Sequence, residues 1–279
     1  MSITGKAAVA GVMGWPVSHS RSPRLHGFWL EAYGIDGAYV PLAVAPENFE
    51  AALRGLAALG MKGCNVTLPH KERALALADH ADDTARRIGA ANTVVVRGDG
   101  SLAVSNTDAF GFIENLEARA PGWPSKRPAV LLGAGGASRA VIVALLDAGV
   151  PEIRLANRTL ERAQALADGF GPAVRAIAWD ARSDALDGAG LLVNGTQLGM
   201  AGQPPLEIAL DALPGDAVVY DLVYVPLQTA LLKDAAARRL RCVDGLGMLL
   251  HQARPGFAAW FGREPEVTAA LYDHIAEGL

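Results

Sequence analysis

Short apolar runs alternate with amphipathic segments along the first hundred residues, which is the pattern of an α/β domain. The runs predict strands over residues 7–13, 38–44 and 61–68. One helix is predicted to begin at Ser22, with serine as the cap ahead of Pro23, and others at Pro46 and Lys71. A hairpin is predicted where two further apolar runs flank a Gly-Asp-Gly turn, at residues 93–97 and 101–104.

A second α/β section follows a proline-rich break at residues 121–124. Its apolar runs predict strands over residues 129–132, 152–156, 174–178, 191–194 and 217–222. A glycine-rich turn and an apolar helix, ending near Gly149, follow the first of these strands. The tail from Gly245 to Gly262 is helical in pattern, and Pro255-Gly256 is expected to interrupt or kink it.

Composition excludes several classes of protein. The chain has 279 residues, of which 51% are hydrophobic and 19% charged, so it is predicted to be ordered and long enough for two domains. The net charge of −4, with no dense basic run, argues against nucleic acid as a partner, and no apolar run is long enough to span a bilayer.

The two cysteines, Cys64 and Cys242, lie in apolar runs. Buried reduced thiols are therefore favoured over a disulfide, and no histidine or cysteine cluster has the spacing of metal ligands. We expect a cytoplasmic protein with no metal site.

The segment Asn65 to Lys71 places a hydroxyl, on Thr67, and an amine beyond a predicted strand. Side chains at the carboxyl end of a strand in an open α/β sheet face the crevice where such folds bind ligands. Lys71 is one of only five lysines, and lysine, unlike arginine, can give up its proton when its surroundings favour the neutral form. The alternative interpretation is a water-exposed lysine at the start of a helix.

The second section carries a candidate nucleotide site at Gly133-Ala134-Gly135-Gly136-Ala137-Ser138, between a predicted strand and a helix. Glycines in this context let the backbone turn sharply and approach a pyrophosphate at the positive end of the helix. Ser138 stands where the usual pattern has a third glycine, and it is small enough for close packing of helix and strand. Tight glycine turns before helices are common, so the motif alone does not decide the function.

The next predicted strand ends in Asn157-Arg158-Thr159, and Arg162 follows one turn later. An NAD site normally has an acidic residue here, which would repel a 2′-phosphate. Asparagine with two arginines suits that phosphate, because guanidinium groups bind its oxygens in a two-pronged geometry. NADP is therefore favoured over NAD, and the alternative is a solvated start of a helix.

Seven sequence blocks, in order over nearly the whole chain, resemble those of the shikimate dehydrogenase family. They cover residues 19–26, 65–72, 89–93, 106–108, 194–200, 220–226 and 245–252. Each block alone is weak, and together they are specific. Three positions depart from the family's usual residues: Gly27, His70 and Ala109. None of the three carries the expected chemistry, so they bear on fine substrate preference.

The resemblance implies an α/β substrate domain at residues 1–108, a Rossmann-like NADP domain at 109–244, and C-terminal helices at 245–279 that return to the substrate domain. It also implies NADP-linked reversible reduction of 3-dehydroshikimate to shikimate, a step of chorismate and aromatic amino acid biosynthesis. The expected partner is this small-molecule substrate, and the expected state is a monomer or a homodimer.

The resemblance further implies roles for individual residues. Lys71 and Asp108 would be the catalytic pair. The substrate would be bound by Ser20, Ser22, Thr67, Asn92, Tyr224 and Gln252. The cofactor would contact Gly133, Ala134, Gly135, Gly136, Ala137, Asn157, Arg158, Thr159, Arg162, Thr196, Leu222 and Gly245.

Local alternatives exist for three of these polar residues: Ser22 or Asp108 could serve only as a helix cap, and Asn92 only in a turn. Rival functions are a dual quinate/shikimate dehydrogenase using NAD, a non-catalytic metabolite-binding homologue, and a structural α/β protein. The residues Asn157 to Thr159 argue against NAD, and the presence of both Lys71 and Asp108 argues against a non-catalytic homologue.

Overall fold

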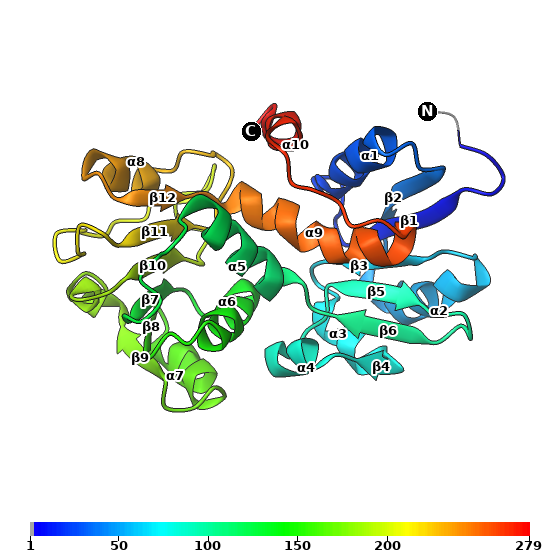
Figure 1. Cartoon of the computed structure of the whole chain (residues 1–279). Coiled ribbons are helices and arrows are strands. Elements are labelled where there is room, and N and C mark those ends of the chain that lie inside the picture. The colour runs from blue at the N-terminus through cyan, green and yellow to red at the C-terminus, as the bar shows by residue number, and fades with distance from the viewer. Residues whose placement is uncertain (1–2) are drawn as a thin grey trace. The chain divides into compact units, whose positions relative to one another are not determined.

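In the computed structural model, which describes residues 3–279, the chain folds into two units with a six-stranded sheet each (Figure 1). The first unit contains Met1–Asp108 and Gln252–Ile275, and the second contains Ala109–His251 and Ala276–Leu279. The long helix α9 (Gly245–Phe261) contributes residues to both units.

The first unit has a mixed sheet with the strand order β2-β1-β3-β5-β6-β4. Strand β1 pairs in parallel with β2 and β3, while β5 is antiparallel to both β3 and β6. The strands are β1 (Ala8–Gly14), β2 (Gly37–Ala43), β3 (Gly63–Val66), β4 (His80–Ala81), β5 (Thr93–Val96) and β6 (Leu102–Ser105). The helices are α1 (Ser22–Ala32), η1 (Pro46–Asn48), α2 (Phe49–Ala58), α3 (Lys71–Leu77), α4 (Asp83–Ile88) and α10 (Ala269–Ala276).

The core of this unit forms because the amphipathic helix α2 buries its apolar side. Phe49, Leu53 and Leu56 are at most 1% exposed and pack against Met13 and Val66 of the sheet. Burying such side chains fully contributes about 1.5–3 kcal/mol each. The sheet and its helices therefore form a rigid base from which the loops at the strand ends project.

The second unit has an all-parallel sheet with the strand order β12-β11-β10-β7-β8-β9. Its strands are β7 (Ala129–Leu132), β8 (Ile153–Asn157), β9 (Val174–Ala178), β10 (Leu191–Asn194), β11 (Val218–Asp221) and β12 (Arg241–Val243). Its helices are α5 (Asp108–Arg119), α6 (Gly136–Asp147), α7 (Leu160–Asp168), η2 (Trp179–Ala181), η3 (Asp184–Leu186) and α8 (Ala230–Ala237). This is the doubly wound order, whose switch point lies between β7 and β10.

The predicted hairpin and the predicted strand positions are confirmed, with three local corrections. The predicted strand over 61–68 is shorter, since its pairing with β1 ends at Val66 and Leu68 is 72% exposed. Ser22 is not a helix cap: Arg21 holds that position, and no side chain makes the capping bond. Helix α9 is not interrupted, because it continues through Pro255.

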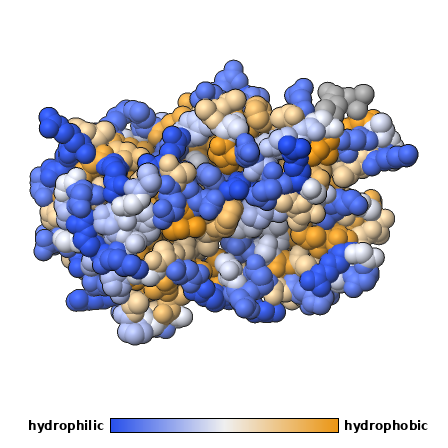
Figure 2. Space-filling view, in the orientation of Figure 1, coloured by the Kyte–Doolittle hydropathy of each residue, from blue (hydrophilic) through white to orange (hydrophobic). Residues whose placement is uncertain are grey.

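Both cysteines are free thiols, as predicted, although only Cys64 is buried and Cys242 is half-buried. None of the described helices is both long and apolar enough to cross a bilayer. Figure 2 shows hydrophilic residues over much of the visible face, with apolar residues between them in small groups.

A buried histidine gives the first unit a pH-dependent stability. The His26 ring is fully buried and stacks on Tyr39 with 3.9 Å between ring centroids, beside Trp29 and Phe257. Burial lowers the pKa of His26 from 6.5 to about 3. The unfolded chain therefore binds more protons than the folded protein between these values, so stability rises with pH across this window and is lost as pH falls below 6.5.

We expect this effect to amount to about 2 kcal/mol of unfolding free energy at pH 5, since each pKa unit corresponds to about 1.4 kcal/mol. Urea unfolding of the parent protein and of His26→Phe at pH 7.5 and pH 5 measures it, because phenylalanine keeps an aromatic ring and removes the titration. The parent should lose about 2 kcal/mol more than the variant. Equal losses would contradict a neutral buried His26.

Candidate active site

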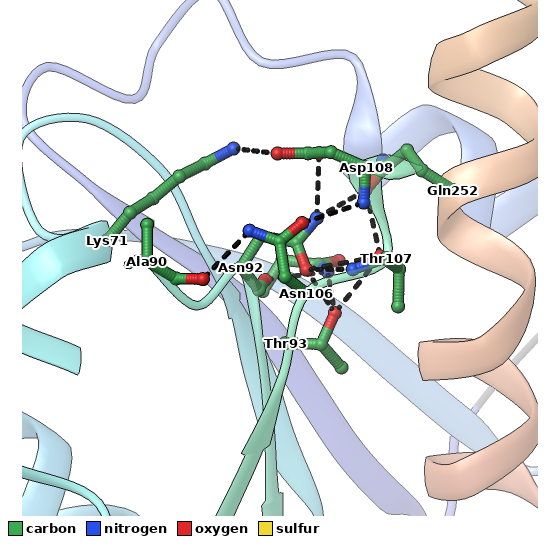
Figure 3. Close-up of polar contacts among 9 residues, drawn as sticks. Lys71, Ala90, Asn92, Thr93, Asn106, Thr107, Asp108 and Gln252 are labelled. Atoms are coloured by element: carbon green, nitrogen blue, oxygen red, sulfur yellow. Dashed lines mark hydrogen bonds and ion pairs between the residues drawn. The ribbon is translucent and has the colours of Figure 1, made fainter. Parts of the chain in front are cut away.

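The predicted catalytic pair is brought together in the first unit. Lys71 begins α3 and Asp108 begins α5, and the Lys71 Nζ atom lies 2.6 Å from Asp108 Oδ2 (Figure 3). The lysine side chain is 28% exposed and that of the aspartate 15% exposed, so both are shielded yet accessible. An ion pair at this depth is screened less than a surface pair. The ammonium group can therefore be held in one place while remaining open to a ligand.

The backbone around Lys71 is fixed by His70, one of the positions that depart from the family pattern. The His70 ring is fully buried, stacks on Phe49 at 4.3 Å, and has its Nε2 atom 2.7 Å from the Val44 carbonyl oxygen. Because a carbonyl oxygen only accepts, Nε2 carries the proton. The Lys71 carbonyl in turn accepts a hydrogen bond from Ala91 N at 2.9 Å. These contacts hold the start of α3 against its neighbours.

Asn92 links Asp108 to helix α9. Its Nδ2 atom donates to Asp108 Oδ1 at 2.8 Å and to Gln252 Oε1 at 3.2 Å (Figure 3). The Asp108 carboxylate therefore accepts from Asn92 on one oxygen and from Lys71 on the other. Asn92 does more than serve in a turn, and Asp108 does more than begin a helix.

Three polar residues of this cluster, Thr93, Asn106 and Thr107, are absent from the predicted site. Asn106 Oδ1 accepts from Asp108 N at 3.0 Å, and its Nδ2 donates to the Ala90 carbonyl at 2.8 Å. Thr107 donates to Asn92 Oδ1 from its backbone N at 2.9 Å. All three are buried, and their only signal in the sequence is that they adjoin Asn92 and Asp108 in the matched blocks.

The two predicted serines lie at the beginning of α1. Ser22 is 8% exposed, Ser20 is half-buried, and Ser20 Oγ accepts from Ser22 N at 3.3 Å. Between them, Arg21 donates to the Ile275 carbonyl at 2.9 Å and so ties this turn to α10. Thr67 follows β3 in the same unit and is half-buried. Tyr224, the remaining predicted substrate residue, lies in the second unit, after β11.

The glycine-rich turn of the second unit has the features of a pyrophosphate site. Gly133 has a φ of +98°, and a Cβ there would lie 2.9 Å from Thr196 Cγ2, so this position requires glycine. Gly135 and Gly136 are exposed at the start of α6, and a Cβ on either would meet only open space. The packing of the protein therefore does not require glycine at these two positions. Glycine there leaves room for a ligand to approach the backbone closely.

Asn157 joins the glycine turn to the end of β8. Its Oδ1 accepts from Ala134 N at 3.2 Å, and its Nδ2 donates to the Thr159 carbonyl at 2.8 Å. Arg158, Thr159 and Arg162 follow at the beginning of α7, and all three are exposed. The strand ends in Asn157, where an NAD site has an acidic residue, and the two guanidinium groups that follow fit a phosphate on the adenosine ribose.

The other predicted cofactor residues, Thr196, Leu222 and Gly245, follow β10, β11 and β12, at the same edge of the parallel sheet. Thr196 is held by Asn194, whose Oδ1 accepts from the threonine N at 3.0 Å and from its Oγ1 at 2.7 Å. A Cβ on Gly245 would overlap the Leu222 carbonyl, so glycine is required for this close approach.

Asp221 holds this edge together and was not predicted. Its carboxylate is buried and accepts from Asn194 Nδ2 at 2.8 Å, Thr229 Oγ1 at 2.6 Å and Val223 N at 3.0 Å. Burial raises the pKa of Asp221, and these three hydrogen bonds oppose that rise. The loops after β10 and β11 are therefore fixed to one another before any ligand binds.

Two family models match separate parts of the chain. A family model described as the shikimate dehydrogenase substrate binding domain matches residues 12–94, and one described as shikimate / quinate 5-dehydrogenase matches residues 117–198. The shikimate dehydrogenase (NADP(+)) of Paramagnetospirillum magneticum is 61% identical over 270 residues, covering 96% of this chain and 98% of the relative.

Two solved structures are similar over nearly the whole chain. Shikimate 5-dehydrogenase from Thermus thermophilus, in complex with NADP(H) and shikimate, has a TM-score of 0.86 and 39% identity, and the match covers 98% of this chain and 100% of that one. Quinate dehydrogenase from Corynebacterium glutamicum, in complex with NAD, has a TM-score of 0.89 and 32% identity, covering 96% and 98%.

Proposed function

The chain belongs to the shikimate dehydrogenase family, and we propose that it catalyses the reversible NADP(H)-dependent reduction of 3-dehydroshikimate to shikimate. The observation that carries the chemistry is the Lys71–Asp108 pair at 2.6 Å, surrounded by amide and hydroxyl groups of the first unit. The family's activity requires a proton carrier beside a ring oxygen, and the pair supplies one.

Lys71 is the proton carrier in this proposal. When bound, NADPH supplies a hydride to the ring ketone, and negative charge develops on its oxygen. The Lys71 ammonium donates a proton to that oxygen, and in the reverse direction its neutral amine accepts the hydroxyl proton. Asp108 orients the ammonium through Oδ2 and can accept from a neighbouring substrate hydroxyl.

The remaining substrate contacts follow from the polarity of a polyhydroxylated acid, which needs several fixed polar partners. Ser20 and Ser22, at the beginning of α1, would bind its carboxylate. The hydroxyls would be bound by Thr67, Asn92, Gln252 and Tyr224. On Asn92 a substrate hydroxyl would replace Gln252 Oε1, the more distant acceptor at 3.2 Å, while the other hydrogen bonds keep the amide oriented, so that it loses little freedom on binding.

The cofactor assignment rests on the second unit. The turn from Gly133 to Ala137 would hold the pyrophosphate at the start of α6, because the first N–H groups of a helix have no acceptor within the helix and point toward an anion. Arg158 and Arg162 would bind the 2′-phosphate, beside Asn157 and Thr159. The loops that carry Thr196, Leu222 and Gly245 would line the rest of the site.

A dual quinate and shikimate activity is the second candidate, because the quinate dehydrogenase from Corynebacterium glutamicum, solved with NAD, is 32% identical to this chain. One experiment separates the two. Oxidation of NADPH and NADH, each with 3-dehydroshikimate and with 3-dehydroquinate, is followed by absorbance. We expect turnover with NADPH and 3-dehydroshikimate far above the other three combinations. Comparable turnover with NADH and 3-dehydroquinate would favour the second candidate. No turnover with any of the four combinations would refute both candidates.

We also infer a cytoplasmic enzyme that is a monomer or a homodimer. The free thiols Cys64 and Cys242 support a reducing compartment. Light scattering of the purified protein measures its mass, and a mass above that of two chains would contradict the inferred state.

A further inference from the structure

A chain of buried hydrogen bonds runs through the first unit to the catalytic aspartate. Tyr39 Oη donates to Asn65 Oδ1 at 2.6 Å, and Asn65 Nδ2 donates to Thr93 Oγ1 at 3.3 Å. Thr93 Oγ1 donates to Asn92 Oδ1 at 2.9 Å, and Asn92 Nδ2 donates to Asp108 Oδ1 at 2.8 Å. Every donor in this series points toward the carboxylate, an arrangement in which successive bonds strengthen one another.

The direction of the series follows from atoms whose roles are fixed. The Asn92 side-chain atom that faces Thr107 N must be Oδ1, because a backbone N–H only donates. The Asn65 atom that faces the Asn92 carbonyl, at 3.2 Å, must be Nδ2, because a carbonyl only accepts. With both amides oriented, the hydroxyl between them, on Thr93, accepts from Asn65 and donates to Asn92.

Figure 3 shows Thr93 below the Asn92 amide, on the side away from Lys71 and Asp108. Thr93 is 2% exposed, so no water replaces its hydroxyl at the Asn92 oxygen without a change in packing. Among residues 3–279, the donors to the Asn92 oxygen thus lie on this inner side and come from Thr93 and Thr107. Both hydrogens of the amide nitrogen are consequently directed to Asp108 and Gln252.

We propose that Thr93 is a positioning residue for the reaction: its hydroxyl fixes the Asn92 amide in the orientation that holds the Asp108 carboxylate against Lys71. The catalytic consequence rests on the proposed function, whereas the orientation of the amide does not. Without the hydroxyl, the Asn92 oxygen loses one of its donors and keeps those of Thr107, so rotation of the amide is opposed less strongly. In the rotated form the amide oxygen faces the Asp108 carboxylate, which repels it and loosens its contact with Lys71.

Two variants separate the hydroxyl of Thr93 from its packing. Thr93→Val keeps the shape and removes the hydroxyl, while Thr93→Ser keeps the hydroxyl and removes a methyl group. Both should be less stable than the parent, by similar amounts. If Thr93 served only in packing, both variants would therefore lose activity. If its hydroxyl positions Asn92, Thr93→Val should lose activity and Thr93→Ser should keep it.

We expect Thr93→Val to lower kcat by about 10-fold, because it removes the hydrogen bond from Thr93 to Asn92 and the net contribution of one hydrogen bond corresponds to a factor of about this size. Its KM for 3-dehydroshikimate should rise, because Asn92 and Gln252 belong to the proposed substrate site, while its KM for NADPH should stay within about two-fold of the parent value. Thr93→Ser should restore kcat to within about two-fold. Equal losses in the two variants, or parent-like kinetics in both, would overturn the proposal. If the valine variant does not fold, Thr93→Ala takes its place beside Thr93→Ser, since the two differ only in the hydroxyl.

A measurement without substrate keeps this test independent of the proposed function. In protein labelled with ¹⁵N-asparagine, the Asn92 side-chain NH₂ signals are identified by their absence from Asn92→Ala. They should exchange slowly with solvent in the parent and in Thr93→Ser, and faster by at least about 10-fold in Thr93→Val. Unchanged exchange in Thr93→Val would overturn the proposal even if the enzyme is active. An inactive parent protein with the expected exchange pattern would refute the proposed function alone.

Discussion

Lys71→Ala is expected to lower turnover by about 10²–10⁴-fold, which is the usual contribution of a positioned acid or base. The structure gives the reason, since Lys71 Nζ is held 2.6 Å from Asp108 Oδ2, and α3 and its neighbours fix the backbone at Lys71. Removing the amine leaves no donor there for the charge that develops on the substrate oxygen. The effect on KM for 3-dehydroshikimate should be smaller, because the serine and amide contacts remain.

Steady-state kinetics with NADPH and 3-dehydroshikimate measure this loss. Lys62→Ala is the matched control, because Lys62 is exposed and precedes β3 in the same unit. Circular dichroism of both variants should show parent-like spectra. If Lys71→Ala keeps turnover within a few-fold of the parent, the lysine is not the proton carrier.

Arg158→Ala is expected to weaken NADP(H) binding by roughly 10–100-fold, since hydrogen bonds between charged groups contribute about 1.5–3 kcal/mol each. Arg158 is exposed where β8 meets α7, and the strand ends in Asn157 rather than in an acidic residue that would hold a ribose hydroxyl. Binding of NAD(H) should change little, because NAD(H) carries no 2′-phosphate. The ratio of the two affinities, rather than either alone, reports on the role of the arginine.

Isothermal titration calorimetry with NADP⁺ and NAD⁺ gives both affinities. Arg175→Ala serves as the control, because Arg175 is also exposed in the second unit but lies within β9, away from the glycine turn in sequence. Its affinities should match those of the parent. Equal loss of NADP⁺ and NAD⁺ affinity in Arg158→Ala would make Arg158 a structural residue.

The sequence by itself determined the second sheet closely. Strands β7 and β10 were predicted at their observed positions, because strands buried on both faces are short, continuous apolar runs bounded by turn residues. The glycine turn before α6 was equally clear, since the need for glycine at Gly133 is local: it follows from a φ of +98°. Lys71 was singled out because an amine follows a predicted strand, whereas Asp108 was assigned through the resemblance of its sequence block to a known family.

Only the tertiary structure decided how far elements extend and which polar groups meet. Strand β3 ends at Val66 because its pairing with β1 ends there, although the apolar run continues to Leu68. Helix α9 continues through Pro255 because its following residues are anchored: Phe257 is buried, and Trp260 donates to the Val94 carbonyl at 2.9 Å. Packing can override the local preference of proline.

The same holds for the site. Asn92 and Gln252 are 160 positions apart and meet at 3.2 Å, so no local pattern could show that the two amides share a hydrogen bond. Nor does the sequence state which way the Asn92 amide points, because that depends on donors from Thr93 and Thr107 on neighbouring loops and strands. The sequence states the residue types. The directions of their hydrogen bonds depend on the fold, which pairs β5 with β6 and packs α9 against β5.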